Sequence, residues 1–477
     1  MPWAPAVSTR ERLSYGLGDF ASGLYWQTFT IYLTFFYTDV FGLGALAVGT
    51  MLGISRSLDA LFDPLMGVIA DRTQTRWGKF RPYLLWLCGP LALAGVLAFT
   101  VPDAAPGARL TWAWVTFNVL MLLYTGINIP YTAMLAVLTP NPAERTSIAS
   151  IKFVFAFAAG MLVSAAVLPL CRVLGAGDAA LGWQRCFMLL GGLATVGFLV
   201  TFVGTRERIR PSRQQVTHLR RDLLDMFTNR PWLVLVGFTL LFNLTMSVRS
   251  SVGVHYLKYY VGEQPVTLPA FLPGIGGTRA FSLEELVSIF STGGGLACLC
   301  GVVLMPAVVR VLGRKPAFLV MYGVVLVSTV AVYWVRPEQV SLLFCLGLVS
   351  GFAGGPLSPL LWAMYADTVD YAEWKTGRRS TGLVFATVIF ASKQGWALGA
   401  IVSLGLLSRF GFVANAAQTP ESLNGLVLLV SVAPGVIGAL ALLLVLFYPL
   451  HEGHLEEIGA ELGARRAAAD VAVAAGQ

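Results

Sequence analysis

Charged side chains are scarce in this sequence. Of its 477 residues, only 12% are Asp, Glu, Lys or Arg, and 56% are hydrophobic. Soluble domains carry roughly 25% charged residues. No polar stretch reaches the length of about 50 residues that a separate soluble domain needs. The composition excludes an ordinary soluble protein and predicts a membrane protein with many spans. It also argues against a membrane sensor, because a sensor needs a soluble output domain.

Histidine and cysteine are few, and neither is clustered. The sequence has four histidines and six cysteines, and only His255 of the histidines falls inside an apolar stretch. The cysteines lack the spacing of metal ligands. A catalytic site needs a clustered nucleophile and base, or a metal set. The sequence therefore predicts a protein that is not an enzyme and that uses no cofactor beyond a coupling cation.

Basic residues gather in alternate loops, and the net charge is +8. An excess of Lys and Arg marks cytoplasmic loops. The pattern predicts cytoplasmic termini and an inner-membrane location, with the lipid bilayer, a small molecule and no nucleic acid as partners, and a monomeric state. The biased side carries Arg10, Arg12, Arg72, Arg76, Lys79, Arg81, Arg206, Arg208, Arg210, Arg213, Arg220, Arg221, Arg230, Arg310, Arg314, Lys315, Lys375, Arg378 and Arg379, against Arg109, Arg279 and Arg336 on the other side.

Apolar stretches recur about twelve times, each long enough to cross roughly 30 Å of hydrocarbon. The basic linker 205–230 separates a first half, 1–204, from a second, 231–448, and a cytoplasmic tail follows at 449–477. The sequence predicts an all-α membrane protein built from two six-helix bundles. The expected spans are 13–38, 46–70, 83–101, 111–137, 148–171, 183–204, 232–260, 284–309, 317–335, 341–366, 383–408 and 423–448.

The two halves repeat each other. A loop with glycine and basic residues follows the second span of each half, at 76–82 and at 313–316. Lys152 and Lys393 also stand at nearly the same offset from these loops. A duplicated six-span unit is typical of transporters whose substrate site lies at the interface of the repeats.

The second expected span holds two aspartates and an arginine. Asp59 and Asp63 are four residues apart, and Arg56 precedes the first by three. These offsets turn the side chains toward one helix face. A carboxylate at mid-bilayer costs on the order of 3 kcal/mol, so such groups face a polar interior. The trio predicts a proton or cation site with an associated charge network.

A polar stripe runs along the first expected span. Its members share one helical face and are expected to line a hydrated cavity rather than face lipid. Hydrogen bonding between helices is the alternative for its Ser, Gln and Thr side chains. The stripe comprises Asp19, Ser22, Gly23, Trp26, Gln27 and Thr30.

Basic residues also occur inside the spans. Lys152, Arg249 and Lys393 are either counter-ions for the buried aspartates or ligands for an anionic substrate group. Lys152 is the better candidate for a counter-ion. Arg249 is the better candidate for a substrate carboxylate, because no acidic partner is apparent in its half. Trp26, Trp362 and Trp396 are candidates to stack on the apolar face of a sugar ring, although interfacial anchoring or core packing explains any one of them equally well.

Several motifs together resemble the glycoside-pentoside-hexuronide:cation symporters, the melibiose permease group of the major facilitator superfamily. The resemblance covers both halves in order and implies a major facilitator fold and cation-coupled sugar import by alternating access. The motifs are Leu13-Ser14-Tyr15-Gly16, Tyr37-Thr38-Asp39-Val40, Asp59-Ala60-Leu61-Phe62-Asp63-Pro64-Leu65-Met66-Gly67, Arg76-Trp77-Gly78-Lys79-Phe80-Arg81-Pro82, Asn128-Ile129-Pro130-Tyr131, Ala366-Asp367-Thr368-Val369-Asp370-Tyr371 and Lys393.

The resemblance implies a cation site of Asp59, Asp63 and Thr125. Phe62 stands where the sodium-using melibiose permease has an amide. A hard cation needs several oxygen ligands, whereas a proton needs one carboxylate of suitable pKa. The sequence therefore favours a proton over sodium, with sodium at Asp59 and Asp63 as the alternative.

The implied sugar site departs from the family pattern. Gly23 and Asn128 stand where melibiose permease has sugar-binding carboxylates, and Asp19 lies one turn before Gly23. A less negative pocket makes a galactoside doubtful and favours a uronide or a pentoside. The alternative within this fold is a lysophospholipid–sodium symporter, against which the polar stripe of the first span argues.

Overall fold

The computed structural model describes residues 7–139, 142–208, 228–262, 265–268, 277–377 and 381–450, together with 453–464 apart from 456, 459 and 463. Residues 209–227, most of the predicted linker, lie outside the described residues. So does most of the predicted tail.

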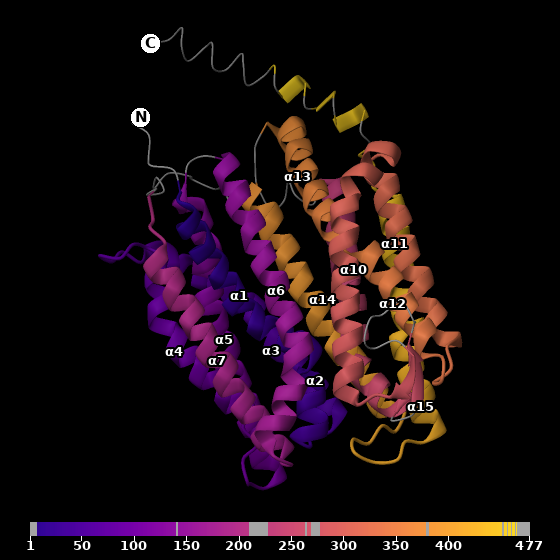
Figure 1. Cartoon of the computed structure of the whole chain (residues 1–477). Helices are drawn as coiled ribbons and strands as arrows, with labels where there is room; N and C mark the ends of the chain where they lie inside the picture. The colour runs from indigo at the N-terminus through magenta and orange to yellow at the C-terminus, as the bar shows by residue number, and fades with distance from the viewer. Residues whose placement is uncertain are drawn as a thin grey trace.

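The first half of the chain forms one bundle of long helices, coloured indigo to magenta in Figure 1. Its first helix begins at a Ser8 cap, whose hydroxyl accepts a hydrogen bond from Glu11 N. This span ends in a π-helix, η1, and is therefore longer than expected. The elements are α1 (Thr9–Ile31), α2 (Leu33–Phe35), η1 (Phe36–Val40), α3 (Ala45–Arg72), α4 (Arg81–Ala98), α5 (Pro106–Leu138), α6 (Pro142–Gly175) and α7 (Ala179–Gly204).

The second half forms the neighbouring bundle, coloured pink to yellow (Figure 1). Two of its spans are broken. Gly355 and Pro356 separate one pair of helices, and Ser431 separates another just before Pro434, whose missing N–H interrupts the helical ladder. The elements are α9 (Arg230–His255), η2 (Tyr256–Val261), β1 (Pro265–Leu268), β2 (Gly277–Ala280), α10 (Leu283–Leu312), α11 (Arg314–Ala331), η3 (Val332–Trp334), α12 (Val340–Gly354), α13 (Leu357–Thr376), α14 (Thr381–Arg409), α15 (Pro420–Val430) and α16 (Val432–Leu446).

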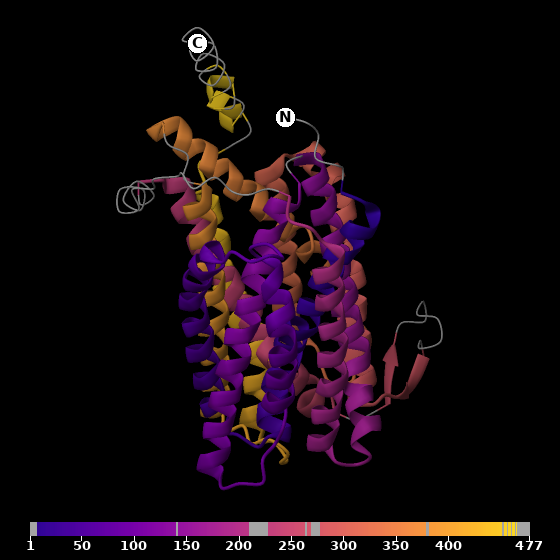
Figure 2. The same ribbon diagram turned by 90° about the vertical axis from the view of Figure 1, so that its left-hand side faces the viewer.

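The helical content confirms the predicted all-α membrane fold. Among the described residues, eleven helical segments are long and apolar enough to cross a membrane. The segment formed by α1, α2 and η1 completes the expected set, although its polar stripe lowers its mean hydropathy. One departure from the predicted all-α fold is the antiparallel pair of β1 and β2, which projects from the side of the bundles in Figure 2.

Two tyrosines fix α1 against α5 beside the polar stripe. Tyr131 donates its hydroxyl hydrogen to Tyr15 O at 2.8 Å, and Tyr15 donates back to Tyr131 O at 3.2 Å. Their rings stack with centroids 4.7 Å apart. Because α1 is held in this rotation, Asp19, one turn beyond Tyr15, faces the centre of the molecule.

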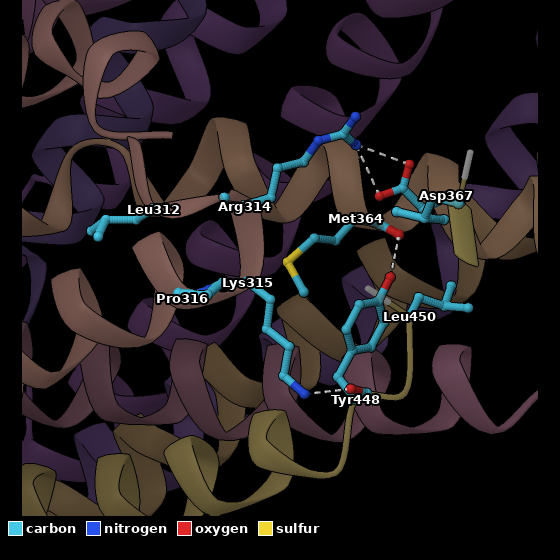
Figure 3. A pocket seen from close by; sticks show the side chains of 10 residues that line it. Leu312, Arg314, Lys315, Pro316, Met364, Asp367, Tyr448 and Leu450 are labelled. Atoms are coloured by element: carbon cyan, nitrogen blue, oxygen red, sulfur yellow. Dashed lines mark hydrogen bonds and ion pairs between the residues drawn. The ribbon is translucent and has the colours of Figure 1, made fainter. Parts of the chain in front are cut away.

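The glycine–basic loops of the two halves make similar contacts. Arg81 Nε donates to Phe202 O near the end of α7, at 3.1 Å. Lys315 Nζ donates to Tyr448 O after the end of α16, at 2.6 Å. Figure 3 shows Lys315 beside the Arg314–Asp367 ion pair, around a small cavity of about 260 Å³. In both halves a basic side chain therefore caps the last carbonyls of the sixth span.

The bundles meet along α3 and α14. We call the end at which α1 begins the near end, and the opposite end, where α2 and α15 lie in Figure 1, the far end. Ser57 Oγ donates to Gln394 Oε1 across the α3–α14 seam, at 3.2 Å. This seam brings the aspartates of α3 against the second bundle.

Candidate functional site

A cavity of about 490 Å³ lies between the two bundles. Sites for small molecules usually measure roughly 300–1,000 Å³. Helices α1, α3, α5 and α6 line one side of it, and α9, α13 and α14 line the other. The sequence-predicted residues that line it are Asp19, Gly23, Trp26, Gln27, Asp59, Asp63, Thr125, Asn128, Lys152, Trp362 and Lys393.

The two aspartates of α3 share one lysine of α14. Lys393 Nζ lies 2.8 Å from Asp59 Oδ2 and 2.5 Å from Asp63 Oδ2. Thr125 donates its hydroxyl hydrogen to Asp59 Oδ1. Asp63 Oδ1 is buried and accepts no hydrogen bond from the described residues. Two carboxylates and one ammonium group leave a net charge of −1 and one free acceptor, which is what a single monovalent cation would fill.

Arg56 lies beside this cluster but does not line the cavity. Its Nη1 donates to Trp396 O at 3.4 Å, and its guanidinium carbon lies 5.5 Å from the centre of the Trp396 ring. Trp396 in turn meets Trp26 edge to face, with ring centroids 6.1 Å apart. Arg56 therefore connects α3 to α14 in the seam rather than contacting the cavity directly.

Asp19 and Lys152 face each other in the same cavity. Lys152 Nζ lies 3.5 Å from Asp19 Oδ1. The ammonium group also lies 5.4 Å from the centre of the Tyr131 ring, within the distance for attraction between a cation and an aromatic face. Both groups are mostly buried, with side chains 20% and 15% exposed. The structure thus brings Lys152 to the carboxylate for which the sequence offered it as a counter-ion.

Arg249 is not brought to the cavity. Its Nη1 donates to Ser350 Oγ at 3.1 Å and to Thr329 Oγ1 at 3.3 Å, which places the guanidinium between α9, α11 and α12. It lies inside the second bundle, behind the cavity wall. The structure therefore gives no support to its predicted contact with a substrate carboxylate.

Sequence reasoning missed the polar residues on the second bundle's wall. Asn243 Nδ2 donates to Thr239 O at 2.8 Å, and Thr239 also shares a hydrogen bond with the Tyr365 hydroxyl. Ser358 and Ser392 line the cavity as well. Asn243 and Thr239 share a helix face at an offset of four, and that spacing within an apolar span was the available signal.

A family model described as MFS/sugar transport protein matches residues 14–452. This chain belongs to that family. It is 34% identical over 471 residues to the putative glycoside/cation symporter YagG of Escherichia coli (strain K12), covering 98% of this chain and 97% of the relative. It is 33% identical over 453 residues to the isoprimeverose transporter of Lactiplantibacillus pentosus, covering 94% of this chain and 89% of the relative.

A solved structure agrees with the fold. A mutant of the nucleoside transporter NupG superposes on 91% of this chain and 99% of its own length, with a TM-score of 0.66 and 12% sequence identity. The resemblance of this chain to the glycoside–cation symporters of the major facilitator superfamily is thus confirmed for family and fold.

This family member is closed at its far end by a cluster around the buried Asp39, which we call the far-end seal. Asp39 Oδ1 accepts from Lys258 Nζ at 2.6 Å and from the Tyr259 hydroxyl, and its Oδ2 lies 3.1 Å from His255 Nε2. Asn415 Nδ2 donates to Asp39 O at 2.6 Å. Thr38 of the first bundle also donates to Asp39 Oδ2, at 2.7 Å. Because Asp39 belongs to the first bundle and Lys258, Tyr259, His255 and Asn415 belong to the second, the cluster joins the bundles.

Proposed function

We propose that this protein is a secondary active symporter that imports a sugar or glycoside together with a cation by alternating access. The observation that supports this most is the cluster of Asp59, Asp63 and Lys393 in a cavity between two bundles. A net negative site with a free carboxylate oxygen changes charge when a cation binds. Since Lys393 is on α14 and the aspartates are on α3, cation binding also alters the attraction between the bundles.

The coupling cation is a proton rather than sodium in this proposal. Sodium requires several oxygen ligands, and the side chains at the cluster offer Asp59, Asp63 and Thr125, with Phe62 in place of the family's amide. A proton requires only Asp63 Oδ1, which is buried and has no partner among the described residues. One proton per sugar neutralises the cluster.

The sugar lies between Trp26 of α1 and Trp362 of α13. The Trp362 side chain is 50% exposed although it stacks on Phe385, with ring centroids 5.5 Å apart. Such a ring offers a flat apolar face to a sugar. Gln27, Asn128 and Asn243 supply hydrogen-bonding groups nearby. The names of the relatives, a glycoside/cation symporter and an isoprimeverose transporter, support this substrate class.

The other candidates are less well supported. A lysophospholipid carrier needs an apolar path for an acyl chain, whereas Asp19, Asn128 and Lys152 line this cavity. A carrier rather than an enzyme is proposed, because the relatives are named as a symporter and a transporter.

The orientation follows from the basic loops. We place the near end, with both termini, in the cytoplasm of a cell whose inner membrane holds the carrier as a monomer. The far-end seal then faces outward, and closure of the outer end is what an inward-facing state requires. Import requires the Asp39 contacts to break so that the outer end opens.

Replacing Tyr259 with Phe should weaken the far-end seal. The substitution removes the hydroxyl that donates to Asp39 and accepts from Asn415 N at 2.8 Å. Hydrogen bonds to charged groups are worth about 1.5–3 kcal/mol, so the equilibrium should shift at least about tenfold toward an open outer end. Distances between spin labels at Ala108 and Ala417, exposed on the two bundles at that end, measure the shift.

Tyr260→Phe is the matched control for Tyr259→Phe. Tyr260 donates to Val335 O at 3.2 Å, a contact within the second bundle. The control should leave the label distances unchanged. If both variants leave the distance distribution of the parent protein intact, the Asp39 cluster does not hold the outer end closed.

Uptake under imposed gradients tests the proposed function. Membrane vesicles containing the protein should accumulate a labelled glycoside when a proton gradient is imposed, and less when a sodium gradient replaces it. One charge moving through about 100 mV provides about 2.3 kcal/mol, enough for roughly fifty-fold accumulation. If neither gradient accelerates the uptake of any glycoside, the proposed function is wrong.

A further inference from the structure

We infer that the substrate is an uncharged glycoside and that pairing of Lys152 with Asp19 makes the cavity reject glycuronides. The inference rests on the proposed function and specifies its substrate class. Its basis is the arrangement of the charged groups in the cavity. A uronide needs a cation free to meet its carboxylate, and the sequence offered Lys152, Arg249 and Lys393 for that role.

Each of these cations is committed or out of reach. Lys393 bridges Asp59 and Asp63 at 2.8 Å and 2.5 Å. Lys152 lies 3.5 Å from Asp19 and is held over the Tyr131 ring. Arg249 is directed at hydroxyl groups inside the second bundle. Among the residues that line the cavity, a sugar carboxylate therefore finds no basic group that is not already beside a carboxylate.

The charge balance leads to the same conclusion. Among the groups that line the cavity, three carboxylates, Asp19, Asp59 and Asp63, and two ammonium groups give −1 when all are ionised. The Arg56 guanidinium lies behind this lining, in the α3–α14 seam, and is not part of the count. Binding of one coupling cation brings the lining to zero. A neutral sugar leaves the charge of the lining at zero. A glycuronide is ionised at pH 7 and returns that charge to −1 in the loaded state, in which the bundles reorient within the membrane interior. An uncompensated charge there is expensive.

Three p-nitrophenyl glycosides that differ only in the substituent at C5 test this inference. Xylosides, glucosides and glucuronides of p-nitrophenol carry at C5 a hydrogen, a CH2OH group or a carboxylate, respectively. Uptake of each, as α- and β-anomers, would be measured at pH 7 in vesicles with an imposed proton gradient. The neutral member of at least one matched pair should enter at least tenfold faster than its glucuronide.

The outcomes separate the inference from the proposed function. Equal or faster uptake of a glucuronide under the gradient overturns the uncharged-substrate inference and leaves the symporter intact. A result in which none of these compounds, and none of a wider panel of neutral disaccharides, responds to either gradient overturns the proposed function and the inference with it.

Asp19→Asn tests whether the pairing is responsible. The substitution keeps the shape but frees Lys152, so the ratio of glucuronide to neutral uptake should rise at least tenfold. Asp19→Glu retains the charge and should retain the rejection. An unchanged ratio in Asp19→Asn overturns the assignment to Lys152. Should that variant fail to transport, purified protein answers the same question, because nitrophenyl groups quench Trp26 and Trp362 on binding and report affinity without transport.

Discussion

Asp63→Asn should abolish accumulation of sugar against its gradient while downhill exchange persists. Asn cannot take up a proton, and with Asp63 neutral the cluster has one carboxylate, Asp59, for one ammonium group, Lys393, at 2.8 Å. The cluster of the variant therefore always has the net charge of the cation-loaded state, so the bundles can change between the outward-facing and inward-facing states without the coupling cation. Accumulation should fall from roughly fifty-fold to none at about 100 mV.

Asp103→Asn is the control for this change. Asp103 is exposed between α4 and α5, so the same loss of charge occurs far from the cavity. Both variants would be assayed in vesicles for proton-driven uptake and for exchange of labelled against unlabelled sugar at equal concentrations. Wild-type accumulation by Asp63→Asn would remove Asp63 from the coupling mechanism, whatever its effect on exchange.

The spacing of residues in the sequence predicted most of the side chains that face the cavity from the first bundle; Thr30, at the end of the predicted stripe, does not line the cavity and donates to Trp26 O. The stripe of α1 and the aspartate pair of α3 each lie on one helix face, and helical periodicity determines that face without knowledge of the neighbours. Asp19, Trp26 and Asp63 all line the cavity. The resemblance added Thr125, whose hydroxyl donates to Asp59.

Partners across the bundles could not be derived from spacing. Arg56 precedes Asp59 by less than one turn, yet the closest cation to both aspartates is Lys393, 334 residues further along the chain than Asp59. Arg249 illustrates the opposite difficulty, because the sequence predicted a substrate contact that the structure does not support. A charge in an apolar span predicts a protein-facing side chain, but only packing decides which interior it faces, and here it meets Thr329 and Ser350.

Uncharged polar residues of the cavity wall were the hardest to predict from the sequence. Asn243 and Thr239 lie in an apolar span, where single amides and hydroxyls commonly bond back to their own helix, as Asn243 does to Thr239 O. Their place on the cavity wall depends on the rotation of α9 against α14. Close contacts with Gly395 and Gly399 set that rotation, since an added Cβ would lie 2.5 Å from Leu240 O and 2.4 Å from Ser247 Cβ, respectively.

Gly53→Val should hold the carrier with its outer end open. Gly49 and Gly53 form a small-residue face on α3 against α14, the spacing that lets membrane helices approach closely. A Cβ at Gly53 would lie 2.2 Å from Ile401 Cγ1 and 3.2 Å from Ala397 O. Overpacking costs about 1–3 kcal/mol, and the outer half of the seam can relieve it by separating. About 2 kcal/mol shifts the equilibrium roughly thirty-fold.

The same helix offers the control for Gly53→Val. An added Cβ at Gly67 meets nothing within 4 Å, so Gly67→Val should transport normally. Gly53→Val should lose most uptake and lengthen the distance between spin labels at Ala108 and Ala417, whereas weakened sugar binding alone would leave that distance unchanged. Normal transport by Gly53→Val, with the outer ends still close, would mean that the α3–α14 seam accommodates the larger side chain and that packing at Gly53 does not control closure of the outer end. Normal transport with the outer ends held apart would mean that import does not need this seam to close. Because the seam carries Lys393 to the aspartates, that second result would also separate cation binding from the movement of the bundles.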